Sequence, residues 1–330
     1  MNKIEFPRVG VDGVKYSQSD IERKYMSGRW VRNVSRRLRD IPPTGKAYLD
    51  KAIAFMANNP AYYLLASPQK LERIVRFVDK VFPDDFAYIN NKGVWASTQV
   101  GSDILNALNY STYRSTKLTK IAKCINVKAC PYCNMHYTLY SDDKSKPLAK
   151  FQFDHFYDKC KYPMLSMSLY NLIPSCAVCN HGKSNVSLPI DFNPYYSSIA
   201  DKFHFELHDP VGLYGAKKVA DEVDVDIVAE PGVSINDVKK FNDTFHLKAL
   251  YSRHGDVAQE VFDKAYEYPY YNNPSNFGFL SKYGPDYLKR LWMGTYPDSN
   301  DIEKRPMTKF IQDLWKQAGI VSEEMDDFVE

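Results

Sequence analysis

Apolar residues recur at three- and four-residue intervals through much of the first 125 residues, a spacing that predicts helices. Leu71, Ile74, Val75 and Val78 follow this spacing and are expected to face a core. Proline residues punctuate the pattern and mark the ends of helices. A last helix of this part of the chain is expected over residues 102–123. The N-terminal third is therefore predicted to be helical.

Shorter stretches in the middle of the chain alternate between apolar and polar residues, as half-buried strands do. Residues 148–156 and 169–173 are expected to form two strands. Pro174 suits the first turn of a helix, because its missing N–H group is not needed there. That helix is expected to end before Pro189. Two strands followed by one helix are thus predicted for this segment.

The last part of the chain mixes both patterns. Residues 203–207 and 223–227 alternate and are expected to pair as strands. Ser234 is a good N-cap for a following helix, and a final helix is expected over residues 308–317. We therefore predict an α+β fold in three regions: a helical N-terminal region with a basic arm at 1–125, a middle region at 126–190, and a mixed, mostly helical C-terminal α+β region at 191–330.

Length and composition are those of a globular protein. The 330 residues are 44% hydrophobic, enough for two or three domains. The sequence contains no apolar run of about 18 residues, and its start lacks the apolar core of a signal peptide. We expect a cytoplasmic protein without a membrane partner. The net charge is only +3, so any nucleic-acid surface is expected to be local.

Two stretches nevertheless concentrate positive charge. Seven Lys and Arg residues fall within residues 23–39. The second set recurs at every third position and consists of Arg114, Lys117, Lys120 and Lys123. Such cations bind nucleic acid by releasing counterions from phosphates. A solvated helix face explains either stretch as well, and so does a partner-binding arm for the first.

Four of the six cysteines stand in two CxxC pairs, Cys130 with Cys133 and Cys176 with Cys179. Each tight turn presents two thiolates, and two such turns complete a tetrahedral zinc shell. We predict that these residues bind Zn²⁺. A zinc ion held by four thiolates has no open position, so its role is structural.

Asp154, His155 and Asn171 stand between the two pairs, and Asn180 follows Cys179 in the ending CAVCNHGK at residues 176–183. This order and spacing resemble the HNH, or ββα-metal, endonucleases whose catalytic hairpin and helix are clasped by zinc knuckles. The resemblance covers about one sixth of the chain. It implies a ββα-metal core in the middle region and the hydrolysis of nucleic-acid phosphodiester bonds.

The chemistry assigns a role to each residue. His155 is expected to be the general base, because imidazole accepts protons near neutral pH. Asp154 and Asn180 offer hard oxygen ligands, which favour Mg²⁺ or Mn²⁺. Because neighbouring strand residues point to opposite faces, a bend or bulge is expected at Asp154–His155. The resemblance implies that Asn171 orients the imidazole by a hydrogen bond.

Lys183 lies one helical turn beyond Asn180 and is expected to contact a phosphate. Each of these residue types also has an ordinary structural use, since isolated asparagines often form turns. The competing hypothesis is a zinc-organised nucleic-acid-binding or partner-docking module without catalysis.

The broader arrangement, with the stretch GTYPDSNDIEKRPMTKFIQDLW at residues 294–315, resembles the HNH subunits of bacterial antiphage defence systems of the Septu and retron-associated type. That resemblance implies a second chain, an ABC-like ATPase, as the protein partner. The sequence itself contains no phosphate-binding glycine loop. DNA is the favoured substrate, and RNA stays possible.

Overall fold

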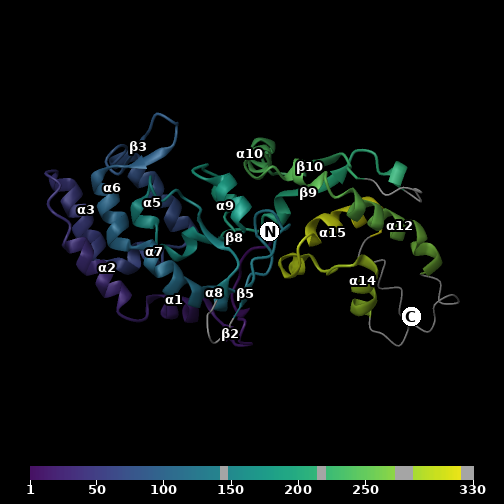
Figure 1. Cartoon of the computed structure of the whole chain (residues 1–330), viewed down its shortest axis with the longest axis horizontal. Helices are drawn as coiled ribbons and strands as arrows, with labels where there is room; N and C mark the ends of the chain where they lie inside the picture. Colours follow the sequence, from purple (N-terminus) through teal and green to yellow (C-terminus); the bar gives the residue numbers. More distant parts are fainter. Residues whose placement is uncertain (142–147, 214–220, 272–284, 321–330) are drawn as a thin grey trace. The chain divides into compact units, whose positions relative to one another are not determined.

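The computed structural model describes residues 1–141, 148–213, 221–271 and 285–320. Its internal contacts divide the chain into two compact units. Unit 1 comprises Met1–Asn2, Lys128–Tyr137 and Ser198–Glu330, and unit 2 comprises Lys3–Val127 and Thr138–Ser197. Helices alternate with small two-stranded sheets (Figure 1). The predicted mixed α+β class is confirmed.

Helices form most of the N-terminal part of unit 2, as the apolar spacing predicts. They are α1 (Gln18–Met26), α2 (Trp30–Arg39), α3 (Ala47–Asn58), α4 (Pro60–Leu64), α5 (Pro68–Val81), α6 (Gln99–Leu108), α7 (Tyr110–Tyr113), the π-helix η1 (Arg114–Leu118) and α8 (Thr119–Ile125). Ser17, Ser67 and Thr98 cap α1, α5 and α6 by accepting backbone N–H bonds. Helix α2 contacts both α3 and α6 (Figure 1).

Two details of this helical part differ from the sequence prediction. Residues 102–123 do not form one helix, because Asn109 adopts a left-handed conformation (φ 49°) that ends α6. Asparagine tolerates that conformation better than most residues, and periodicity does not reveal such a break. The second difference is a short hairpin of β3 (Ala87–Ile89) and β4 (Trp95–Ser97), which stands between α5 and α6.

Unit 2 also contains three further antiparallel strand pairs. They are β1 (Arg8–Val9) with β2 (Lys15–Tyr16), β5 (Tyr140–Ser141) with β6 (Leu148–Ala149), and β7 (Gln152–His155) with β8 (Leu172–Ser175). Short 3₁₀ turns lie at η2 (Pro163–Leu165), η3 (Leu169–Asn171) and η4 (Ile190–Phe192). The loop between β7 and β8 is thus folded rather than extended.

The strand pair β7–β8 leads directly into helix α9 (Ala177–Lys183) (Figure 1). Cys176 is the N-cap, and its sulfur accepts a bond from the Cys179 N–H. Pro174 belongs to β8 and not to the helix, so its predicted place was wrong. The expected bulge is also missing: Gln152 to His155 pair one to one with Ser175 to Leu172. The side chains of Asp154 and His155 therefore leave opposite faces of β7.

Unit 1 is built around one strand pair and several helices. Strand β9 (Phe203–Leu207) pairs antiparallel with β10 (Val225–Ala229), close to the predicted ranges. The helices are α10 (Ile235–Phe245), α11 (Leu247–Tyr251), α12 (Gly255–Tyr271), α14 (Pro285–Met293) and α15 (Thr308–Gln317), with 3₁₀ turns at η5 (Ala200–Lys202), η6 (Val211–Leu213) and η8 (Ser299–Lys304). Ser234 caps α10, and α15 has its predicted bounds.

Aromatic side chains form much of the core of unit 1. Phe205 of β9 lies against Tyr251 and Phe310, with ring centroids 4.3 Å and 5.4 Å away. Phe241 and Phe245 of α10 pack edge to face at 4.8 Å. Among the described residues of both units, no helix combines the length and apolar character needed to cross a membrane.

Candidate functional site

Four buried thiols gather in one cluster. The ligand atoms of Cys130, Cys133, Cys176 and Cys179 all lie within 4.8 Å of one another. A tetrahedral zinc ion with Zn–S bonds of about 2.3 Å places its sulfurs about 3.8 Å apart. The cluster therefore has the composition and size to hold a zinc ion. These are the same four cysteines that the CxxC spacing predicts as zinc ligands.

The backbone around the first pair forms a compact knuckle. Asn134, in a left-handed conformation (φ 51°), donates its N–H to the carbonyl of Cys130 at 2.8 Å. The N–H groups of Met135 and Cys179 each lie 3.4 Å from a thiol sulfur, that of Cys133 and Cys176 respectively. Such N–H···S bonds favour the thiolate form that a metal requires.

Further bonds fix the knuckle within unit 1. The Asn134 amide donates to the carbonyl of Ile302 at 2.8 Å and accepts from the Lys309 N–H at 2.9 Å. The Tyr251 hydroxyl donates to the carbonyl of Cys133 at 2.6 Å. The knuckle is thus held by groups from three other elements and does not depend on its own turn alone.

His155 is half-buried at the end of β7, and its surroundings define which nitrogen carries the proton. Its Nε2 lies 2.9 Å from the carbonyl oxygen of Ser166, an acceptor only. We assign the hydrogen to Nε2, which leaves the Nδ1 lone pair as the proton acceptor. Burial, with smaller effects of Lys159 and Lys183, lowers the pKa of His155 to about 3. The imidazole is therefore neutral at neutral pH.

Asn171 does not make the direct bond to the imidazole that the resemblance implies. Its side-chain oxygen accepts from the Tyr157 N–H at 2.8 Å, and its nitrogen donates to the carbonyls of Tyr157 and Leu165 at 3.1 Å and 3.0 Å. Leu165 precedes Ser166, whose carbonyl holds the ring. Asn171 therefore fixes the loop that positions His155.

Asp154 and Lys183 form a buried ion pair. The carboxylate residue is 2% exposed and the lysine is fully buried. The ammonium lies 3.4 Å and 3.5 Å from the two carboxylate oxygens and donates to the carbonyl of His155 at 2.8 Å. The prediction that Lys183 contacts a phosphate is thus not supported, because its charge is sealed inside the protein. The lysine instead ties α9 to β7.

Asn180 lies on the same helix and faces the same strand. Its amide nitrogen donates to the side-chain oxygen of Gln152, two residues before Asp154. Residues two apart on a strand share a face, so Gln152 and Asp154 both point toward α9. This arrangement brings the predicted ligand Asn180 to the strand that carries Asp154.

Sequence reasoning missed two residues next to His155. The Tyr110 ring lies 4.6 Å from the imidazole, and its hydroxyl donates to the carbonyl of Phe153 at 3.1 Å. Lys159 is exposed, with its ammonium 5.5 Å from the centre of the Tyr110 ring. Neither residue belongs to a motif, so only the fold reveals them.

The four cations at residues 114–123 occupy different environments. Arg114 is exposed and lowers the pKa of Tyr110, although burial raises that pKa to about 12 overall. Lys117 donates to the carbonyls of Lys24 and Ser27. Lys123 pairs with Asp12 at 3.6 Å, whereas Lys120 is exposed. The four cations therefore do not form one exposed row of positive charge. Arg114 is the member that lies near the His155 site.

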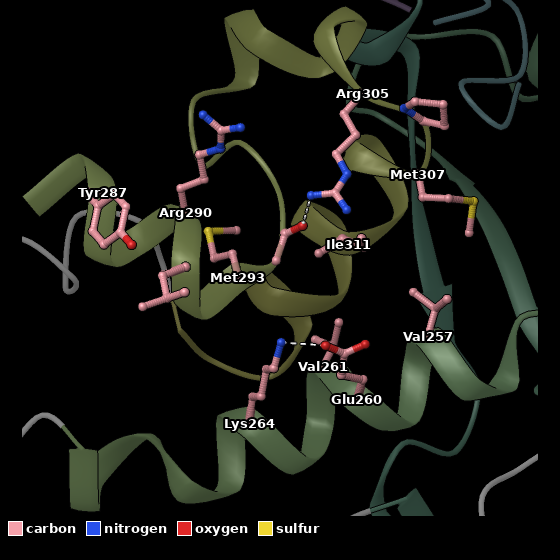
Figure 2. A pocket seen from close by; sticks show the side chains of 13 residues that line it. Val257, Glu260, Val261, Lys264, Tyr287, Arg290, Met293, Arg305, Met307 and Ile311 are labelled. Atoms are coloured by element: carbon pink, nitrogen blue, oxygen red, sulfur yellow. Dashed lines mark hydrogen bonds and ion pairs between the residues drawn. The ribbon is translucent and has the colours of Figure 1, made fainter. Parts of the chain in front are cut away.

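Unit 1 contains a separate hollow of about 700 Å³ (Figure 2). Its walls carry Val261, Met293 and Ile311 together with several charged side chains. Figure 2 shows that two of its cations are already engaged: Lys264 pairs with Glu260, and Arg305 donates to the carbonyl of Gly294 at 2.6 Å. None of the predicted site residues lines this hollow.

Comparisons with protein families, with curated proteins and with solved structures found no match to this chain.

Proposed function

We propose that the chain is a metal-dependent endonuclease of the HNH type that hydrolyses nucleic-acid phosphodiester bonds. The observation that carries the proposal is the unit made by β7, β8 and α9. In that unit Asp154 and Asn180 lie where β7 faces α9, and His155 follows Asp154 on the opposite face of the strand. A strand pair followed by a helix is also what the HNH resemblance implies.

His155 supplies the base. Its Nε2–H is anchored on Ser166, so Nδ1 accepts the proton of an attacking water. Lys159, whose ammonium lies 5.5 Å from the centre of the Tyr110 ring, and Arg114, whose charge acts on Tyr110, are both exposed and would attract the phosphodiester of a substrate. An anion bound at Lys159 cancels part of the positive field on the imidazole, which raises its pKa toward the range suited to a base.

Asp154 and Asn180 would hold the catalytic Mg²⁺ or Mn²⁺. Their donors fit such an ion, because both offer oxygen, and Asn180 uses its nitrogen and not its oxygen to bind Gln152. The ion pair of Asp154 with Lys183 is longer than a typical charge-assisted hydrogen bond, and the metal ion would compete with Lys183 for the carboxylate. The ion would stabilise negative charge on the phosphate as the bond breaks.

The four-cysteine cluster would hold structural Zn²⁺. Cys176 caps the N-terminus of α9 and Cys179 lies in its first turn, so a bound ion fixes the start of the helix that carries Asn180. With four thiolates there is no open position for water, and the zinc takes no part in the reaction.

Nicking of supercoiled plasmid DNA in Mg²⁺ tests the proposal. We expect His155→Ala to lower the nicking rate by about 100-fold or more, which is the typical contribution of a general base to the rate. His208→Ala is the matched control, since that histidine is exposed in unit 1. Equal nicking by the native chain and His155→Ala would refute the assignment of the base. A single-stranded RNA substrate in parallel separates DNA from RNA specificity.

One observation favours the competing function, a binding or docking module without catalysis. Asp154 is almost completely buried against an internal lysine, as a structural carboxylate would be. Under this alternative the chain binds nucleic acid, adding Mg²⁺ produces no cleavage, and His155→Ala leaves binding unchanged.

The proposed partner is a separate ABC-like ATPase chain in antiphage defence, and this part rests on the resemblance alone. Co-expression with the neighbouring gene and purification of the pair tests it. A stable complex whose ATP state changes nicking is expected, and a chain that purifies alone with full activity contradicts it.

A further inference from the structure

Unit 2 contains a groove of about 420 Å³ formed by three segments of the helical part. The C-terminal end of α1 and the turn after it form one wall. The other wall comes from the segment Tyr113–Ile121, which runs from α7 through η1 into α8. Gly28 makes the turn possible, because its φ of 90° is a conformation that other residues rarely adopt. The groove is therefore built from well-defined backbone.

The groove carries positive charge only. Its lining includes Lys24, Arg29, Lys117 and Lys120, and no Asp or Glu. Arg29 and Lys120 are exposed, and in the described part of the chain neither has an ion-pair partner. Four cations around one hollow without a compensating carboxylate attract an anion. We call this feature the cationic groove.

The pKa of Lys117 reflects the same excess of positive charge. Burial, followed by the charges of Lys120 and Lys24, lowers the pKa of Lys117 to about 8. A bound anion would offset this repulsion. The ammonium is already fixed on the carbonyl of Ser27 at 2.9 Å and on its hydroxyl at 3.2 Å. Lys117 therefore adds to the positive electrostatic potential of the groove, whereas Arg29 and Lys120 keep N–H groups for direct contact with the anion.

Trp30 and Tyr113 also line the groove and give it a rigid apolar side. Their rings meet edge to face at 5.2 Å, and both residues are mostly buried. The Trp30 N–H is bound to the carbonyl of Tyr25 at 2.7 Å, so the ring is held in place. Such a wall adds contact area for a ligand larger than a simple inorganic ion.

We propose that the cationic groove binds a phosphate group of a nucleotide-containing ligand, with Arg29 and Lys120 as its direct contacts. A nucleic-acid strand is favoured over a free nucleotide, because the lining segment continues α7, whose first residue Tyr110 lies beside His155; this preference rests on the proposed nuclease function. Lys117 lies seven residues further on, about 10 Å along a helix. A strand is long enough to lie along this segment.

Binding can be measured without cleavage in a His155→Ala background, so failure of this proposal and of the proposed nuclease are separate results. The probe is a fluorescent 20-nucleotide DNA strand, followed by anisotropy at several salt concentrations. Arg29→Gln combined with Lys120→Gln is the test variant. Lys51→Gln combined with Lys80→Gln removes the same charge from exposed positions outside the groove.

We expect the test variant to bind the strand at least 10-fold more weakly than the control variant. Its salt slope should fall by about 1.4, since each lost phosphate contact in a single strand removes about 0.7. ATP is titrated separately, with Trp30 fluorescence as the readout and Trp30→Phe as the blank. ATP binding that the test variant abolishes would support the phosphate site and identify a free nucleotide as its source. Equal affinities of test and control variants for both probes would overturn the proposal.

Discussion

The buried ammonium of Lys183 donates a hydrogen bond to the backbone carbonyl of His155 at 2.8 Å. Lysine is rarely buried completely, because an unpaired charge in the interior costs several kcal/mol. Here the carboxylate of Asp154 supplies the opposite charge at 3.4 Å. One lysine therefore holds the end of α9 against the strand position that presents the proposed base.

Lys183→Met should destabilise unit 2 strongly. The change leaves the Asp154 carboxylate buried without its partner and removes the donor to the His155 carbonyl. Breaking a buried ion pair in this way costs about 3–5 kcal/mol. Urea unfolding followed by circular dichroism measures the loss. The matched control is Lys159→Met, an exposed lysine on the loop after β7, which should change the free energy of unfolding by less than about 0.5 kcal/mol.

Replacing both partners should cost less than replacing the lysine alone. In Asp154→Leu combined with Lys183→Met no unpaired charge remains, and such apolar replacements are often close to neutral. A double variant as unstable as the sum of the two single variants would show that the pair is not coupled.

Cys176→Ser should lose bound zinc and fold stability together. The thiol belongs to the four-sulfur cluster and also caps α9, so its removal weakens both the metal shell and the helix start. Metal analysis of the purified chain and thermal unfolding provide the measurements. Cys160→Ser is the control, because that thiol lies outside the cluster. Unchanged zinc content and unfolding temperature in Cys176→Ser would contradict a structural zinc site.

Asn171→Asp should disrupt the site with almost no change in volume. The new side chain keeps the acceptor for the Tyr157 N–H but loses both donors to the carbonyls of Tyr157 and Leu165. Two buried carbonyls then face a carboxylate, at a cost of about 1–3 kcal/mol each.

The loop that holds His155 through Ser166 should loosen, so nicking should fall by more than the loss of stability explains. Asn58→Asp is the control, because it makes the same change at an exposed helix end. Nicking that falls only in proportion to the folded fraction would limit Asn171 to a structural role.

Local patterns predicted the elements better than their junctions. The spacing of Leu71 and Val75 identifies α5, and the alternation at Phe203–Leu207 identifies β9, because both patterns follow directly from burial on one face. The break at Asn109 was missed, since it depends on one residue adopting a left-handed conformation. Pro174 was placed in a helix, although the pairing of Phe153 with Pro174 makes it part of β8.

In the candidate site too, local spacing predicted some residues, whereas others depend on contacts that only the fold creates. Cys130 and Cys176 are identifiable from spacing alone, because two tight turns can hold one ion. The buried state of Lys183 was not predictable, since it depends on how α9 packs against β7. Tyr110 comes from a helix about 45 residues before His155 and reaches it only through the fold.

Lys117 in the cationic groove should make the free energy of unfolding depend on pH. The pKa of Lys117 is lowered to about 8 in the folded chain, below its ordinary value of 10.5. Between these values the unfolded chain binds more protons, so the contribution of Lys117 to the free energy of unfolding rises with pH. The difference between the native chain and Lys117→Met should therefore grow in favour of the native chain from pH 7.5 to 9.5, as measured by urea unfolding. Lys51→Met, at an exposed position, should give a constant difference. A constant difference for Lys117→Met as well would mean that its bonds to the carbonyls of Lys24 and Ser27 offset burial and the charges of Lys24 and Lys120.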